Sequence, residues 1–120
     1  MTHVSKHFRR EEFLCRCGNC GFDTVDIELI KLLENIRAHF GNRDVQVNSG
    51  CRCEAHNKAE GGSKKSQHLY GRAADIFIMA VPPATIAAYI DSKWPNKYGV
   101  GIYNSWIHID SRSGPAARWG

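Results

Sequence analysis

The chain has 120 residues, of which 42% are hydrophobic and 23% charged, and its formal net charge is +4 at pH 7. These values predict one globular domain over residues 1–120, with a single core and no second domain. The mild positive charge favours anionic partners, which include both nucleic acid and the bacterial cell wall. No stretch approaches the roughly 20 apolar residues of a membrane span, and the N-terminus lacks the apolar region of a signal peptide. We therefore expect synthesis in the cytoplasm without a signal peptide, and no membrane partner.

The spacing of apolar residues predicts helices and strands in a mixed order along the chain. In residues 26–41 apolar side chains recur at intervals of three and four up to Gly41, which predicts an amphipathic helix. A short helix or turn follows at 54–62, and a longer helix opens at Pro82-Pro83 and closes at Pro95. Short apolar runs predict strands at 45–49, 73–79, 99–103 and 106–110. This mixture indicates an α+β fold with a small, mostly antiparallel sheet packed with helices.

The stretch SQHLYGRAAD, residues 66–75, places a histidine and an aspartate around a glycine. On an unbroken helix His68 and Asp75 would lie about 10 Å apart, and on a strand about 23 Å apart on opposite faces. They can share a partner only if the chain turns between them, and Gly71 tolerates such a turn. Period-two alternation places His108 and Asp110 together on one face of the last strand. His68, Asp75 and His108 can then converge on one open face.

Two imidazoles and one carboxylate are a ligand set suited to zinc. In catalytic sites zinc takes three protein ligands and leaves a fourth position for water. The cation can lower the pKa of this water to about 7 and polarise a carbonyl oxygen, which together suit amide hydrolysis. The pattern therefore predicts a Zn²⁺ cofactor held by His68, Asp75 and His108.

Most of the chain resembles the zinc D-alanyl-D-alanine carboxypeptidase family of peptidoglycan peptidases, which also contains phage L-alanyl-D-glutamate endopeptidases. The resemblance is carried by SGCRCEAHNKAEGGSKKSQHLYGRAADI and GVGIYNSWIHIDSRSGPAARW, with the motif Ser-x-His-x-x-Gly-x-Ala-x-Asp and a later His-x-Asp. By this resemblance His68, Asp75 and His108 correspond to the zinc ligands, and Ser66 opens the motif as an expected substrate contact. The resemblance also implies the fold that these peptidases share with the Hedgehog signalling domain.

Two further residues receive expected catalytic roles beside the motif. Arg52 matches the family's arginine that contacts substrate and stabilises charge on the attacked carbonyl, for which a planar guanidinium is well suited. Relatives commonly carry an ionisable group shortly before the last histidine ligand, but here that region reads IYNSWI and contains no acid. Asp110 is then either the general base or the group that orients His108 through a hydrogen bond. Tyr103 is a candidate hydrogen-bond donor to substrate.

Five cysteines form a separate group, and their odd number excludes a complete set of intrachain disulfides. The pairs Cys17/Cys20 and Cys51/Cys53 would close a structural zinc site if the N-terminal segment packs near Arg52. Reduced thiols in the core and a disulfide formed after export are the alternatives.

The resulting hypothesis is a zinc-dependent peptidase that hydrolyses an amide bond in peptidoglycan stem peptides, as a carboxypeptidase or an endolysin-type endopeptidase. The alternative is a zinc-stabilised domain of the same fold that binds cell wall or a protein without turnover. A zinc-ribbon nucleic-acid binder would explain neither Asp75 nor His108, so we expect no nucleic-acid partner. We expect a monomer that acts on the cell wall after phage-mediated release or as part of a virion.

Overall fold

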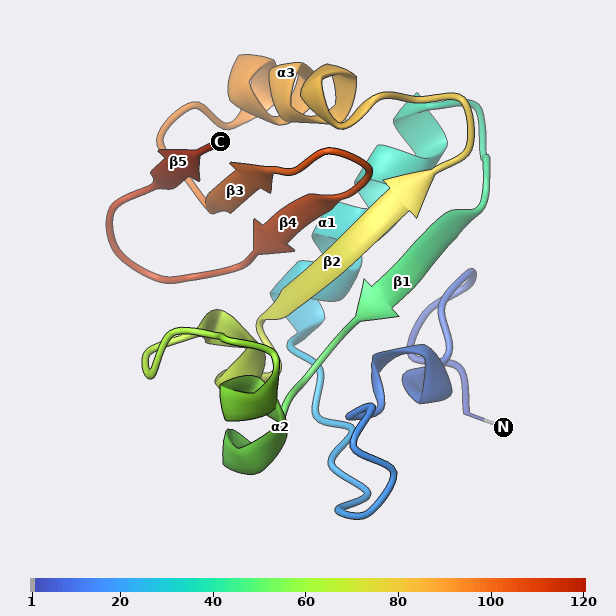
Figure 1. Cartoon of the computed structure of the whole chain (residues 1–120). Coiled ribbons are helices and arrows are strands. Elements are labelled where there is room, and N and C mark those ends of the chain that lie inside the picture. Colours follow the sequence, from blue (N-terminus) through green and yellow to red (C-terminus); the bar gives the residue numbers. More distant parts are fainter. Residues whose placement is uncertain (1) are drawn as a thin grey trace.

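A computed structural model describes residues 2–120 as a five-stranded sheet with helices packed against it (Figure 1). Two of the helical segments are short 3₁₀ turns, labelled η. In chain order the elements are η1 (Arg10–Phe13), α1 (Ile27–His39), β1 (Val45–Ser49), α2 (Glu54–Ala59), η2 (Gln67–Tyr70), β2 (Ala73–Ile78), α3 (Pro83–Lys93), β3 (Gly99–Ile102), β4 (Ile107–Asp110) and β5 (Ala117–Trp119).

The α+β class and the mostly antiparallel sheet are confirmed. The strand order is β1-β2-β4-β3-β5, and only β3 and β5, among the strands of residues 2–120, pair in parallel. Pro83 occupies the first turn of α3, where a missing N–H costs nothing. The sequence did not predict η2 or β5. Arg118 holds β5 in place by donating hydrogen bonds to the backbone carbonyls of Tyr98, Trp94 and Lys97.

The two faces of the sheet have opposite character. In Figure 1 α1 runs behind β2 and β4, and the core lies between the helices and this face of the sheet. The alternation predicted for β2 and β4 is confirmed, because Ile76, Ile107 and Ile109 are fully buried in that core. The opposite face carries Asp75 and His108. Within residues 2–120 no helix has the length and apolar character needed to cross a bilayer.

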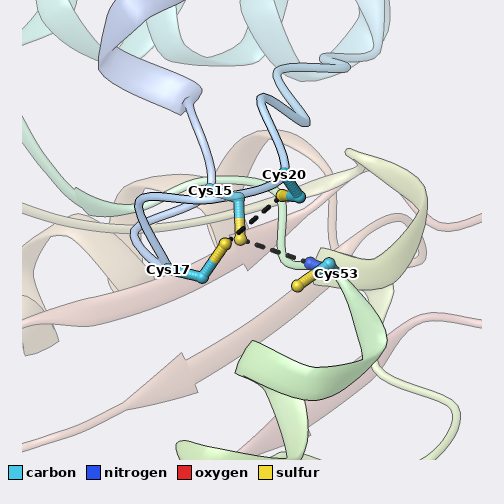
Figure 2. A group of neighbouring side chains, drawn as sticks. All are labelled: Cys15, Cys17, Cys20 and Cys53. Atoms are coloured by element: carbon cyan, nitrogen blue, oxygen red, sulfur yellow. Dashed lines mark hydrogen bonds between the residues drawn. The ribbon is translucent and has the colours of Figure 1, made fainter.

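The cysteines do not group as the spacing suggested. Figure 2 shows Cys15, Cys17 and Cys20 of the N-terminal segment gathered around Cys53, the residue that precedes α2. Cys51 lies elsewhere: its thiol is buried and donates to the backbone oxygens of Phe13 and Phe22. The expected set with Cys51 is therefore wrong, and Cys15 takes the fourth position.

Candidate metal centre and cleft

One row of directly paired residues crosses the sheet on the face opposite the core. Ser49 of β1 pairs with Asp75 of β2, Asp75 pairs with His108 of β4, His108 pairs with Gly101 of β3, and Gly101 pairs with Trp119 of β5. Directly opposed residues place their side chains on the same face of a sheet. A Cβ at residue 101 would come within 2.3 Å of the Trp119 ring, so the glycine leaves the space that the ring occupies. The row therefore brings a carboxylate, an imidazole and an indole together.

His68 reaches this row from η2. Ser66 begins the turn, and its hydroxyl accepts the backbone N–H of His68 at 3.2 Å. Gly71 ends the turn in the left-handed region (φ 67°), as the sequence predicted for a turn between His68 and Asp75. Nδ1 of His68 lies 2.5 Å from the backbone oxygen of Gly50, which can only accept. Nδ1 therefore carries the proton, and the lone pair of Nε2 faces Asp75 Oδ1 at 3.3 Å.

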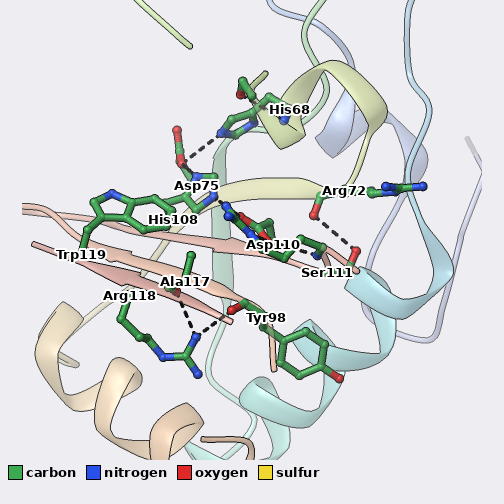
Figure 3. A network of polar contacts seen from close by, with 12 residues as sticks. His68, Arg72, Asp75, Tyr98, His108, Asp110, Ser111, Ala117, Arg118 and Trp119 are labelled. Atoms are coloured by element: carbon green, nitrogen blue, oxygen red, sulfur yellow. Dashed lines mark hydrogen bonds and ion pairs between the residues drawn. The ribbon is translucent and has the colours of Figure 1, made fainter. Parts of the chain in front are cut away.

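His108 is fixed in the complementary tautomer. Its Nε2 lies 2.7 Å from Asp110 Oδ2, an ionised oxygen that accepts, so Nε2 carries the proton. The lone pair of Nδ1 then faces Asp75 Oδ1, also at 3.3 Å. Figure 3 shows His68 and His108 on either side of Asp75. In its neutral form each imidazole thus presents an unprotonated nitrogen to the same carboxylate.

The donor set fits a zinc ion. One ligand atom from each of His68, Asp75 and His108 lies within 4.8 Å of the other two. Both imidazoles donate their second N–H to an oxygen acceptor, an arrangement typical of metal-bound histidine. Burial would raise the pKa of Asp75, but when His108 and His68 are protonated on both ring nitrogens, their hydrogen bonds and positive charges hold it well below its usual range. Asp75 is therefore an anion at neutral pH, as a zinc ligand must be.

Asp110 lies behind His108 and is fully buried. Burial would raise its pKa, but hydrogen bonds from Arg112 and His108 hold the pKa well below its usual range. Both carboxylate oxygens are engaged, since Arg112 donates from its backbone N–H and Nε to Oδ1 and from Nη2 to Oδ2. A general base is most effective with a pKa near the working pH and a free path to substrate. The contacts of Asp110 thus favour the role that orients His108.

Arg52 is held above Asp75 by three hydrogen bonds. Its Nη2 donates to Asp75 Oδ2 at 3.2 Å, its Nε to Ser49 Oγ at 3.2 Å and its Nη1 to Asn57 Oδ1 at 3.3 Å. A guanidinium has five N–H groups, so these bonds leave two for a ligand. The backbone N–H of Arg52 also donates to the backbone oxygen of His68, which links the two segments directly.

Replacing Arg52 with lysine is expected to leave zinc binding intact and to lower turnover by about tenfold to a thousandfold, the range for loss of one oxyanion donor. An ammonium keeps the charge but cannot contact Ser49, Asn57 and a substrate oxygen together. Steady-state kinetics with Arg43→Lys as control would check this, because Arg43 contacts Met79 outside the cleft. Equal rates for Arg52→Lys and wild type would contradict the role of Arg52.

The centre opens into a cleft of about 640 Å³. Its lining includes the predicted residues Arg52, Ser66 and Tyr103. Tyr103 stacks on Trp106 with ring centroids 4.8 Å apart, and its hydroxyl accepts from Trp119 Nε1 at 3.1 Å. Tyr103 is 40% exposed, so it is placed to contact a ligand in the cleft.

Sequence reasoning missed several lining residues. The Trp119 ring lies beside the His108 ring (centroids 5.0 Å apart), and the Arg112 guanidinium lies 5.6 Å from the Trp119 ring centre. Lys65 also lines the cleft, and so does Glu60, one of two glutamates, with Glu54, that the sequence offers as alternative carboxylates to Asp110. For Arg112 the one available signal was its place two residues after Asp110 in IHIDSR. For Trp119 no local pattern pointed to the site.

Comparison with known proteins gives two matches. The family model of peptidase M15 matches residues 6–110, which contain all three residues of the candidate metal centre. The chain is 30% identical over 104 residues to the probable peptidoglycan L,D-endopeptidase MepK of Haemophilus influenzae. This match covers 79% of the chain and 54% of the relative, so the chain spans about half the length of that curated protein.

Proposed function

The chain belongs to the peptidase M15 family, as its motif predicted, and from this premise we propose that it is a zinc-dependent peptidase acting on peptidoglycan stem peptides. The observation that carries the proposal is the pair of imidazoles whose tautomers are set by Gly50 and Asp110 so that both lone pairs face Asp75. In their neutral forms the two imidazoles face one carboxylate oxygen at 3.3 Å with unprotonated nitrogens, which is the donor set of a cation site.

The residues around the centre have distinct roles in the proposed reaction. When bound, zinc would supply an activated water and polarise the carbonyl of the scissile amide. Arg52 would offer its two remaining N–H groups to a substrate oxygen beside Asp75. Gly50 and Asp110 would keep His68 and His108 in the tautomers that bind metal.

The charges in the cleft suit the binding of an anionic peptide. Arg52, Lys65 and Arg112 contribute three cations to its lining, against the carboxylates of Glu60 and Asp75. Stem peptides carry free carboxylates, which suit such a lining, and the aromatic wall of Tyr103, Trp106 and Trp119 can pack on the peptide chain. The relative, a probable peptidoglycan L,D-endopeptidase, supports the same substrate class.

That relative also favours endopeptidase over carboxypeptidase cleavage, so we propose hydrolysis of an internal bond between an L and a D residue. The protein would accordingly act at the cell wall, with phage-mediated release or a place in a virion as the proposed route.

The test is incubation of purified muropeptides of known structure with the zinc-loaded protein, followed by mass spectrometry. An internal L,D cleavage product that is absent with His68→Ala and after chelation would support the proposal, and readdition of zinc should restore it. Release of a terminal D-alanine alone would instead identify a carboxypeptidase. Binding to isolated cell walls without any product would overturn the enzyme and leave the non-catalytic binding module.

Glu60 is the proposed proton acceptor, because it is the one carboxylate besides Asp75 among the described residues that line the cleft. Replacing Glu60 with glutamine is expected to lower turnover by about a hundredfold or more while zinc affinity stays unchanged. Glu54→Gln is the matched control, since Glu54 is exposed at the start of the helix that Glu60 follows and lies outside the cleft. Similar rates for both variants would remove Glu60 from the reaction.

A further inference from the structure

The cysteine cluster lies outside the cleft and has no part in the proposed reaction. The Sγ atoms of Cys15, Cys17, Cys20 and Cys53 all lie within 4.8 Å of one another, and those of Cys17 and Cys20 are 3.4 Å apart (Figure 2). Four sulfurs bound to zinc at about 2.3 Å in a tetrahedron lie about 3.8 Å from each other. The four thiols therefore already have nearly the mutual spacing of a tetrahedral site.

Each of these four sulfurs accepts a backbone N–H. Cys17 accepts from Asn19 and Cys20 from Phe22, each two residues further along the chain. Cys15 accepts from the N–H of Cys53, and Cys53 accepts from the N–H of His56 in the first turn of α2. Hydrogen bonds donated to a sulfur favour the thiolate form, which is the form that binds metal.

Cys51 provides an internal contrast, because its thiol is the donor in its two hydrogen bonds, to Phe13 O and Phe22 O. Both partners are carbonyl oxygens, which can only accept, so these bonds require the protonated thiol. The fold thus places four of the five cysteines as acceptors in one cluster and keeps the fifth protonated.

We infer that Cys15, Cys17, Cys20 and Cys53 bind a structural zinc ion that ties the N-terminal segment to the start of α2. Gly18 (φ 80°) and Gly21 (φ 68°) allow the tight turns that bring Cys17 and Cys20 together. The site would also stabilise the cleft, because Cys53 follows Arg52 and the 50–53 segment supplies the oxygen that holds His68.

Metal content and cobalt spectroscopy of the whole chain, purified under reducing conditions, test this inference independently of peptidase activity. We expect two zinc ions per chain in the wild type, one in His68→Ala and one in Cys20→Ser. After replacement by cobalt, the wild type and His68→Ala should show the sulfur-to-cobalt charge-transfer band of a tetrahedral thiolate site, and Cys20→Ser should lose most of it. Cys51→Ser is the matched control and should keep both the second metal and the band.

Several outcomes would overturn the inference. One is a wild type that holds a single metal and loses it in His68→Ala. A cobalt spectrum without the thiolate band would do the same, and because it is recorded on the unmodified chain it does not depend on whether a variant folds. Equal loss of the band in Cys51→Ser and Cys20→Ser would place the metal elsewhere. A further outcome is that the intact reduced protein does not bind zinc. If mass spectrometry then shows that the chain loses two hydrogens on exposure to air, the cluster instead forms a Cys17–Cys20 disulfide.

Discussion

Replacing His68 or His108 with alanine is expected to abolish peptide hydrolysis and to weaken zinc binding in the cleft more than a change at any residue there that is not a proposed ligand. Each histidine supplies one of three ligand atoms that converge within 4.8 Å. The loss of zinc affinity should exceed the roughly tenfold to hundredfold cost of removing an outer hydrogen bond to a ligand. Isothermal titration with zinc, alongside turnover of a defined muropeptide, measures both effects.

Asp75 should be equally sensitive, and Asp75→Asn should be nearly as damaging as Asp75→Ala. The amide keeps the shape of the side chain but loses the negative charge that attracts the cation and pairs with Arg52 at 3.2 Å. His3→Ala is a suitable control because His3 is exposed and far along the chain from the ligands. Zinc bound in the cleft at wild-type affinity in all three ligand variants would exclude these residues as the metal centre.

The sequence predicted the convergence of His68, Asp75 and His108 because their positions follow local rules. Period-two alternation decided that Asp75 and His108 face away from the core that Ile76 and Ile107 enter, and both isoleucines are fully buried. Gly71 marked the turn that returns His68 to Asp75, and it adopts a positive φ. Alternation cannot give the register between strands, so the direct pairing of Asp75 with His108 became visible only in the structure.

The rest of the site depends on contacts between distant parts of the chain. The three-residue strand β5 has no strong pattern of its own; it is positioned by Arg118 and by pairing with β3, and only then does Trp119 reach His108. The cysteines show the same limit. Spacing alone could not show whether Cys51 or Cys15 joins the cluster. The fold decides this, because it directs the Cys51 thiol to the backbone oxygens of Phe13 and Phe22.

The role of Asp110 can be decided by one substitution. Asp110→Asn is expected to weaken zinc binding in the cleft by about tenfold to a hundredfold, and excess zinc should restore most of the turnover. The reason is that Asp110 Oδ2 accepts the Nε2 proton of His108 at 2.7 Å and so keeps Nδ1 free for the metal. An amide can still accept this proton, but it lacks the charge that makes the imidazole a stronger ligand, and its NH₂ group would face donors of Arg112.

A general base would behave differently under the same change: zinc affinity would stay the same, and the rate would fall by about a hundredfold to ten-thousandfold even at saturating zinc. Measuring the zinc dissociation constant and the rate at saturating zinc therefore separates the two roles. Asp91→Asn is the matched control, because Asp91 also pairs with an arginine, Arg118, but on the exposed side of α3. Because Asp110 is buried and Arg112 would lose its charged partner, the free energy of unfolding should also fall by about 1–3 kcal/mol. If the Asp110→Asn variant has normal zinc affinity and a normal rate, Asp110 neither orients His108 nor acts as the general base.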